Sequence, residues 1–143
     1  NSRHHNRNRH FDRVFGIFGL SLTQIFSYIF APFGYLLGFN GSDILFEGAL
    51  LGKKLILNEF IAFSDLAERI ASLDARTALV SVISLCGFAN VASMGMCIGG
   101  IGVLCPEKRG TISRLIVKAT IAGVFVSINS AFLVSIVSLI PAF

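Results

Sequence analysis

The sequence predicts an all-α integral membrane protein, and three observations lead to that prediction. Apolar residues make up 54% of the 143 residues, charged residues make up 14%, and the mean hydropathy is +0.76. Residues 81–104 and 119–143 carry no charge, and each is longer than the roughly 20 residues that cross a bilayer as a helix. Finally, Glu59 lies inside the apolar run 55–63. A charge at the centre of a membrane helix costs roughly 2.5–3.5 kcal/mol, so we expect Glu59 to face a cavity, a partner or a substrate.

Residues 1–19 form a basic, polar segment before a membrane domain of residues 20–143. His4, His5 and His10 have no acidic or cysteine partner at metal-ligand spacing, so we expect neither a metal site nor a nucleic-acid partner. No apolar signal-peptide core follows this segment. The chain begins with Asn1, and we expect a fragment or a processed product.

The distribution of charge predicts the topology of the membrane domain. Residues 106–118 carry four basic side chains against one acid, whereas residues 64–76 carry three acids against two arginines. Because short loops rich in Lys and Arg stay on the cytoplasmic side, we expect 106–118 inside, and 64–76 and the C-terminus outside.

The first helix is predicted from Ser21 to Leu37. Ser21 and Gln24 have the spacing of a capping box, and Pro32 should kink the helix. With 17 residues and an aromatic surface, this helix could lie along the membrane interface or cross at a strong tilt. We favour the interfacial position.

Residues 42–73 are too polar for one lipid-facing helix, and they predict a re-entrant helical hairpin. Residues 40–43 form a turn in which Ser42 or Asp43 could cap the following helix, and the tip of the hairpin falls near 57–59. Irregular backbone at membrane depth is tolerated where it is buried in protein or lines a cavity. In the alternative interpretation, Glu59 pairs with a neighbouring lysine, Lys53 or Lys54, and holds a bend.

Residues 77–105 contain no charge over 29 residues, which is about nine more than one span needs. Gly87-Phe-Ala-Asn90 lies near the middle, and further glycines follow. These glycines fit either an unwound segment or close helix packing. The Asn90 amide needs hydrogen-bond partners near the midplane, which favours a discontinuous transmembrane helix.

A final transmembrane helix is predicted to begin at Thr111 as its cap. Its small residues recur every four positions and predict a packing seam against another helix. The members of this seam are Ala119, Gly123, Ser127, Ala131 and Ser135.

This order of elements is typical of the second half of an inverted-repeat transporter, where broken helices bind a polar substrate at the midplane. Glu59, Asn90 and Ser93 offer donors and acceptors suited to a polyhydroxyl ligand such as a sugar ring, and Phe88 offers an aromatic face. The sequence shows no nucleophile–base pair and no phosphate-binding glycine loop, so we do not expect an enzyme.

Three motifs in order resemble the C-terminal region of the concentrative nucleoside transporters, from about Leu20 to the end. They are Lys54-Leu-Ile-Leu-Asn-Glu-Phe-Ile-Ala-Phe63, Cys86-Gly-Phe-Ala-Asn-Val-Ala-Ser93 and Gly99-Gly-Ile-Gly-Val-Leu-Cys-Pro-Glu-Lys-Arg109. Ala92 stands where this family commonly has Ser, and Phe63 where Tyr is usual.

The resemblance implies a multi-pass nucleoside importer of the plasma or bacterial inner membrane, driven by sodium or protons and assembled as a homotrimer. Glu59, Asn90 and Ser93 would bind the ribose, and Phe88 would line the nucleobase. No cofactor is implied beyond the coupling ion, whose ligands would lie mostly in a first repeat that is absent from this sequence. A non-transporting membrane remnant, or a small subunit that needs a partner chain, is the alternative.

Overall fold

The computed structural model describes residues 21–140, so the predicted basic segment 1–19 lies outside the described residues. This part of the chain consists of helices joined by short connections, without a strand, which confirms the all-α prediction. Pro106–Val137 is the one helical stretch within 21–140 that is long and apolar enough to cross a membrane. The helices are α2 (Leu22–Leu36), α3 (Ser42–Ile56), α4 (Glu59–Arg69), α5 (Ala75–Leu85), α6 (Val91–Leu104) and α7 (Arg109–Val137), with 3-10 turns at Ile70–Ser72 and Pro106–Lys108.

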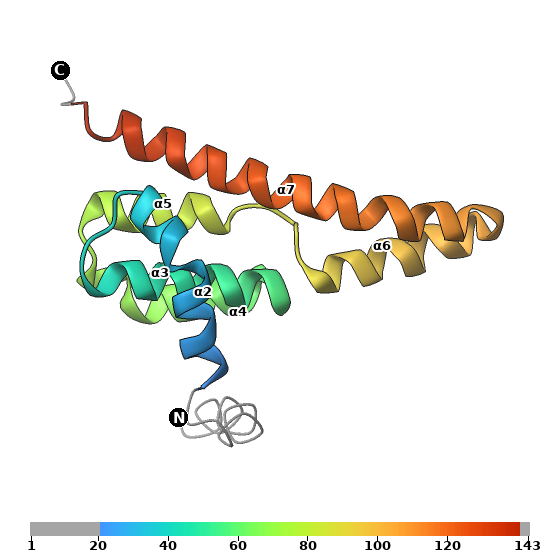
Figure 1. The fold of residues 1–143 in the computed structure, drawn as a ribbon, viewed down its shortest axis with the longest axis horizontal. Coiled ribbons are helices and arrows are strands. Elements are labelled where there is room, and N and C mark those ends of the chain that lie inside the picture. The colour runs from blue at the N-terminus through green and yellow to red at the C-terminus, as the bar shows by residue number, and fades with distance from the viewer. Residues whose placement is uncertain (1–20, 141–143) are drawn as a thin grey trace.

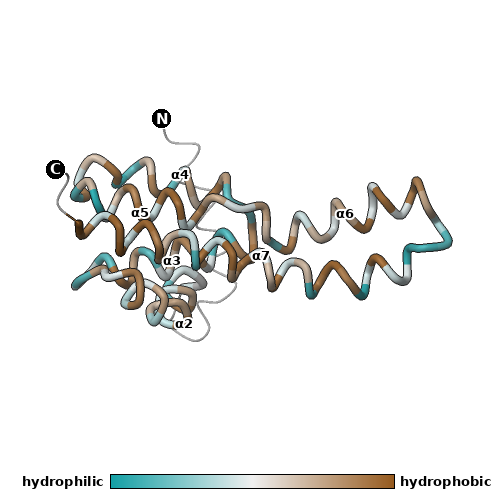
Figure 2. The backbone as a smooth tube through the Cα atoms, turned by 90° about the horizontal axis from the view of Figure 1, so that it is seen from above, coloured by the Kyte–Doolittle hydropathy of each residue, from teal (hydrophilic) through white to brown (hydrophobic). Residues whose placement is uncertain are grey.

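Helix α7 runs the length of the molecule, and α5 and α6 follow one another along it (Figure 1). Helices α2, α3 and α4 gather at the α5 end, whereas α6 and the first half of α7 project as a long hairpin. Figure 2 shows that the turn at the end of this projecting hairpin is hydrophilic. The hairpin therefore has apolar arms and a charged tip, as expected where a chain returns across a membrane.

Helix α2 begins with the predicted capping box, in which Ser21 and Gln24 exchange side-chain to backbone hydrogen bonds. It continues through Pro32 and packs tightly along α3. A Cβ added to Gly48 of α3 would lie 2.5 Å from the carbonyl oxygen of Ser27. Only glycine permits this close approach of two backbones, which is how helices pack where lipid gives no hydrophobic driving force.

Helices α3 and α4 form the predicted hairpin, and the helix is interrupted at Leu57 and Asn58. The charged residues that argued against a single span instead join the two arms. Lys53 forms a salt bridge with Asp65, and Arg69 pairs with Asp43 at 3.2 Å.

The predicted caps of two helices are wrong. Gly41 occupies the N-cap of α3 with no side-chain bond, at φ +56°, because the turn there needs a left-handed residue. Helix α7 begins at Arg109 and not at Thr111, since the 3-10 turn of Pro106–Lys108 leads directly into it.

The discontinuous helix is confirmed as α5 and α6, separated by residues 86–90. Leu85, the last residue of α5, packs with Leu50, Ala62 and Leu66 of the hairpin in one buried cluster. The small-residue seam of α7 buries Ser127, Ala131 and Ser135, which confirms the packing role for that half of the seam. Ala119 is exposed.

Arg76 joins three parts of the chain at the far end of α5. Its guanidinium donates to the carbonyl oxygens of Leu37 and Gly38, which follow α2, and to the hydroxyl of Ser135 in α7 at 2.5 Å. Arginine suits this position because its planar fork carries five donors. The sequence alone gives no sign of these partners, which lie 38 to 59 residues away.

Gly87 begins the interruption between α5 and α6 and lies directly against α7. Its φ is +141°, a region that side chains rarely adopt, and an added Cβ would lie 2.1 Å from the Ser127 hydroxyl oxygen. The interruption can approach α7 this closely only because residue 87 has no side chain.

Arg76→Lys should destabilise the protein by about 1–3 kcal/mol, because one ammonium cannot replace donors to three separated acceptors. Thermal unfolding of the full-length protein in detergent measures the loss. Arg114→Lys is the matched control, since Arg114 is exposed. Equal midpoints for the two variants would contradict the role of Arg76.

Gly87→Ala should destabilise by more than about 1 kcal/mol in the same assay, since alanine meets both an unfavourable φ and the Ser127 hydroxyl. Adding Ser127→Ala should restore part of the loss, because it removes the clash but not the strain. Gly110→Ala, where an added Cβ meets no atom within 4 Å, is the control. An unchanged Gly87→Ala protein would overturn this account.

Candidate functional site

The N-termini of two helices meet at the centre of the molecule. Glu59 is the first residue of α4, directly after the hairpin tip, and Asn90 is the N-cap of α6, directly after the interruption. The Asn90 amide Nδ2 donates to Glu59 Oε2 at 2.6 Å. The structure thus brings together the two polar groups that the sequence placed in separate interruptions of helical structure.

Asn90 and Ser93 form a capping box at the start of α6. The Ser93 backbone N–H donates to Asn90 Oδ1 at 2.7 Å, and the Asn90 N–H donates to Ser93 Oγ at 3.1 Å. Both residues are buried, with exposed fractions of 1% and 3%. These bonds fix the Asn90 side chain so that its Nδ2 points at Glu59 while its Oδ1 satisfies the helix.

Glu59 is half-buried, and neither neighbouring lysine pairs with it. Lys53 pairs with Asp65, and Lys54 donates to the Ser84 carbonyl oxygen at 2.8 Å. The alternative in which a lysine neutralises Glu59 at a bend is therefore wrong. Its carboxylate is held instead by a neutral amide and keeps acceptor capacity for a ligand.

Asn58 has a structural role that its position beside Glu59 does not reveal. Its side chain accepts the N–H of Ile61 at 2.9 Å and so caps α4. Asn58 and Asn90 are thus two asparagine caps, one at each interruption, and they satisfy the first backbone donors of α4 and α6.

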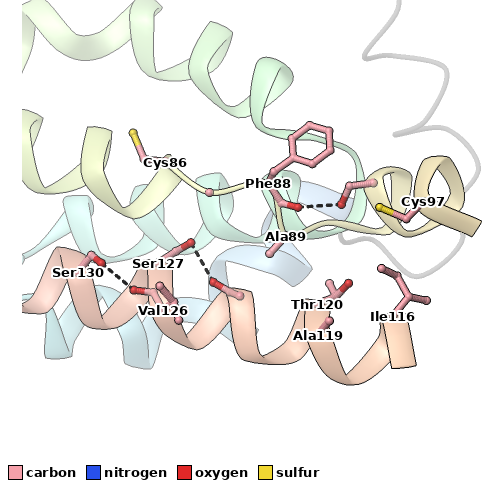
Figure 3. Close-up of a pocket in the computed structure, with 13 residues that line it drawn as sticks. Cys86, Phe88, Ala89, Cys97, Ile116, Ala119, Thr120, Val126, Ser127 and Ser130 are labelled. Atoms are coloured by element: carbon pink, nitrogen blue, oxygen red, sulfur yellow. Dashed lines mark hydrogen bonds between the residues drawn. The ribbon is translucent and has the colours of Figure 1, made fainter. Parts of the chain in front are cut away.

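Phe88 lies in the interruption and remains 63% exposed. Its carbonyl oxygen accepts from the Ser93 hydroxyl at 3.0 Å, while its ring points away from α7 (Figure 3). An exposed ring on an anchored backbone offers a flat apolar surface for a planar ligand.

A cavity of about 340 Å³ lies between the interruption and α7 (Figure 3). Phe88 and Ser93 contribute to its lining, but Glu59 and Asn90 do not. Cys97, Thr120 and the small residues of α7 form much of the remainder. This cavity therefore adjoins the Glu59–Asn90 pair without containing it.

Helix α3 carries two buried charged residues that were not predicted from the sequence. Glu47 is fully buried, and Lys54 is 2% exposed. The two residues are seven apart, a spacing that puts both on one face of a helix, so the periodicity contained a signal. The sequence does not show that α5 covers that face of α3, so it does not predict that the two side chains are buried.

Comparison with known proteins gives one consistent result. Residues 7–135 match the family model described as "Na+ dependent nucleoside transporter C-terminus". The chain is 38% identical over 118 residues to the uncharacterized transporter YutK of Bacillus subtilis, covering 82% of this chain and 29% of YutK. It is 37% identical over 126 residues to the purine nucleoside transport protein NupG of the same organism, covering 86% of this chain and 32% of NupG.

Solved structures of the transporter CNTnw share this fold. The inward-facing, substrate-bound structure aligns with 95% of this chain and 34% of that chain, at a TM-score of 0.86 and 27% identity. An intermediate state of the N149L variant aligns with 96% of this chain and 36% of that chain, at a TM-score of 0.87 and 26% identity.

The chain spans about a third of the length of the relatives and structures it matches. The matched relatives are described as transporters, and the family and the shared fold identify this chain as belonging to a multi-pass membrane protein. It belongs to the Na+ dependent nucleoside transporter family, in the C-terminal region of that family.

Proposed function

We propose that this chain is the C-terminal part of a cation-coupled nucleoside importer and supplies the half of the substrate site that binds ribose. The observation that supports this most directly is the Glu59–Asn90 contact at 2.6 Å between two helix beginnings. A transport function of this kind, rather than an enzymatic one, also agrees with the transporter family of the chain.

The ribose would bind at the edge of the Glu59–Asn90 pair. A ribose ring carries hydroxyls that donate and accept, and Glu59 offers an acceptor of charge-assisted hydrogen bonds. Asn90 can share its second amide hydrogen, and Ser93 holds Asn90 in place through their reciprocal cap. The N-terminal ends of α4 and α6 also direct partial positive charge toward this region, which favours binding of electron-rich oxygen atoms there.

Phe88 would contact the nucleobase, because its exposed ring lies in the same interruption, two residues before Asn90. The coupling cation and the remaining base contacts would come from parts of the transporter outside this chain. The homotrimer implied by the resemblance would likewise assemble through those parts.

Glu59→Gln should lower uridine uptake by the full-length transporter about 10- to 100-fold, the equivalent of roughly 1.5–3 kcal/mol of charged hydrogen bonding. Gln can still accept from Asn90, so surface abundance should not change. Uptake of radiolabelled uridine in vesicles, normalised to surface protein, measures the effect. Glu68→Gln, at an exposed position of the same helix, is the control. Wild-type uptake by the Glu59→Gln variant would contradict the assignment of ribose binding to Glu59.

Phe88→Ala should raise the KM for uridine about 10-fold or more, because stacking of a base on an aromatic ring contributes roughly 1–3 kcal/mol. The exposed ring supports no core, so the thermal midpoint without substrate should stay at the wild-type value. Phe88→Tyr should retain most of the affinity. An unchanged KM in Phe88→Ala would remove Phe88 from the site.

A further inference from the structure

Glu47 lies fully buried on α3 and belongs to a polar network outside the proposed substrate site. Its Oε2 lies 2.8 Å from the Ser81 hydroxyl oxygen, and its Oε1 lies 2.5 Å from the Ser84 hydroxyl oxygen. The Ser84 hydroxyl oxygen also lies 2.8 Å from the Ser81 carbonyl oxygen. All of these oxygens belong to residues of zero exposure.

The number of protons in this network decides its state. Its three oxygen–oxygen contacts can be made by the two serine hydroxyl protons alone, or by those two and a third proton on Glu47. The Ser81 carbonyl oxygen can only accept. If Oε1 of Glu47 is protonated, that group can donate to Ser84 while the Ser84 hydroxyl donates to the Ser81 carbonyl oxygen. With Glu47 ionised, the Ser84 hydroxyl donates to Glu47 Oε1 and can share its proton with the Ser81 carbonyl oxygen.

We propose that Glu47 is a proton-binding carboxyl group that takes up and releases a proton during the transport cycle. On uptake, a hydronium ion of the aqueous phase gives its proton to Oε1 and leaves as water, and the Ser84 hydroxyl turns from Glu47 to the carbonyl oxygen of Ser81. On release, the O–H bond at Oε1 breaks, the proton returns to water, and Ser84 turns back to donate to the carboxylate. This inference rests on the proposed transport function and adds a site to it.

Lys54 connects this carboxyl group to the interruption between α5 and α6. The Lys54 ammonium donates to the carbonyl oxygen of Ser84, the same residue whose hydroxyl contacts Glu47. Ser84 lies near the end of α5, two residues before the interruption begins at Cys86. A change of proton at Glu47 therefore acts on the backbone that leads directly to Phe88 and Asn90.

Lys54 keeps a polar partner whether Glu47 is charged or neutral. Lys54 is buried on the face that carries Glu47, and its ammonium donates to the Ser84 carbonyl oxygen at 2.8 Å. Loss of the negative charge at Glu47 therefore does not leave the ammonium without a hydrogen-bond acceptor.

The other charged groups near α3 have partners of their own. Lys53 and Asp65 pair with each other, as do Asp43 and Arg69, whereas Glu68 of α4 is exposed.

The other helices packed against α3 place no further charged side chain next to Glu47. Helix α2 contributes no charged residue, and its Tyr28 and Tyr35 are exposed. On α5, Arg76 is bound to carbonyl oxygens at the other end of the helix, and Cys86 follows its last turn. Helix α6 carries Cys97 and no charged residue.

The test compares wild type, Glu47→Gln and Glu47→Asp in the full-length transporter, with Glu68→Gln as a matched exposed control. Infrared difference spectra across a pH titration report the protonated carboxyl group without any need for transport. Proteoliposomes containing a pH-sensitive dye report proton influx when uridine is added. Uridine uptake is measured with and without sodium, which separates proton coupling from sodium coupling.

We expect Glu47→Gln to lose one titrating carboxyl band and the uridine-driven proton influx. Its ratio of uptake at about pH 6 to uptake at about pH 8 should fall to about one, because no proton is left to titrate. Glu47→Asp should keep a pH-dependent uptake with a shifted midpoint, and it provides the test if Glu47→Gln does not fold. Glu68→Gln should behave as wild type.

The proposal would be overturned if Glu47→Gln kept the titrating band, the proton influx and the pH profile of the wild type. If Glu47→Gln does not fold, a Glu47→Asp profile identical to wild type would do the same. Absence of uridine uptake in the wild type would instead contradict the proposed function, and the infrared titration would still report on Glu47.

Discussion

The hydrogen bond between Asn90 and Glu59 joins the two interruptions around which this chain is organised. Each interruption exposes the first backbone donors of a new helix, and an apolar environment provides no water to satisfy them. Asn58 and Asn90 supply those partners as caps. The need to satisfy these backbone donors therefore places polar side chains at both interruptions. Because the two interruptions face each other, their side chains together are suited to a polar ligand.

The elements around this contact hold it in place. Helix α7 supports α5, the interruption and α6 along one side, and its small residues allow Gly87 to lie against Ser127. The hairpin is closed by the Lys53–Asp65 pair and by the apolar cluster that includes Leu85. At the far end, Arg76 joins α2, α5 and α7. The position of Glu59 relative to Asn90 thus depends on packing that extends to both ends of the molecule.

Helix α3 carries two buried charged residues, Lys54 and Glu47, and their hydrogen-bond partners give them different roles. Lys54 has a fixed partner in a backbone carbonyl, so its role is to connect the hairpin to the end of α5. Glu47 contacts two hydroxyls that can each turn, so its network has two proton arrangements. The proposed proton exchange at Glu47 would act close to the end of α5, which leads to the interruption that carries Phe88 and Asn90.

The sequence by itself determined the order and type of the elements, because hydropathy, helix period and capping residues act over short stretches. It located the interruptions at 57–59 and 87–90, with the candidate residues Glu59, Phe88 and Asn90 within them and Ser93 directly after the second. Only the tertiary structure decided that Glu59 bonds to Asn90 rather than to a lysine, that Arg76 binds three distant acceptors, and that Glu47 is buried. These outcomes depend on which helix covers which face, and partners 31 to 59 residues apart leave no local pattern in the sequence.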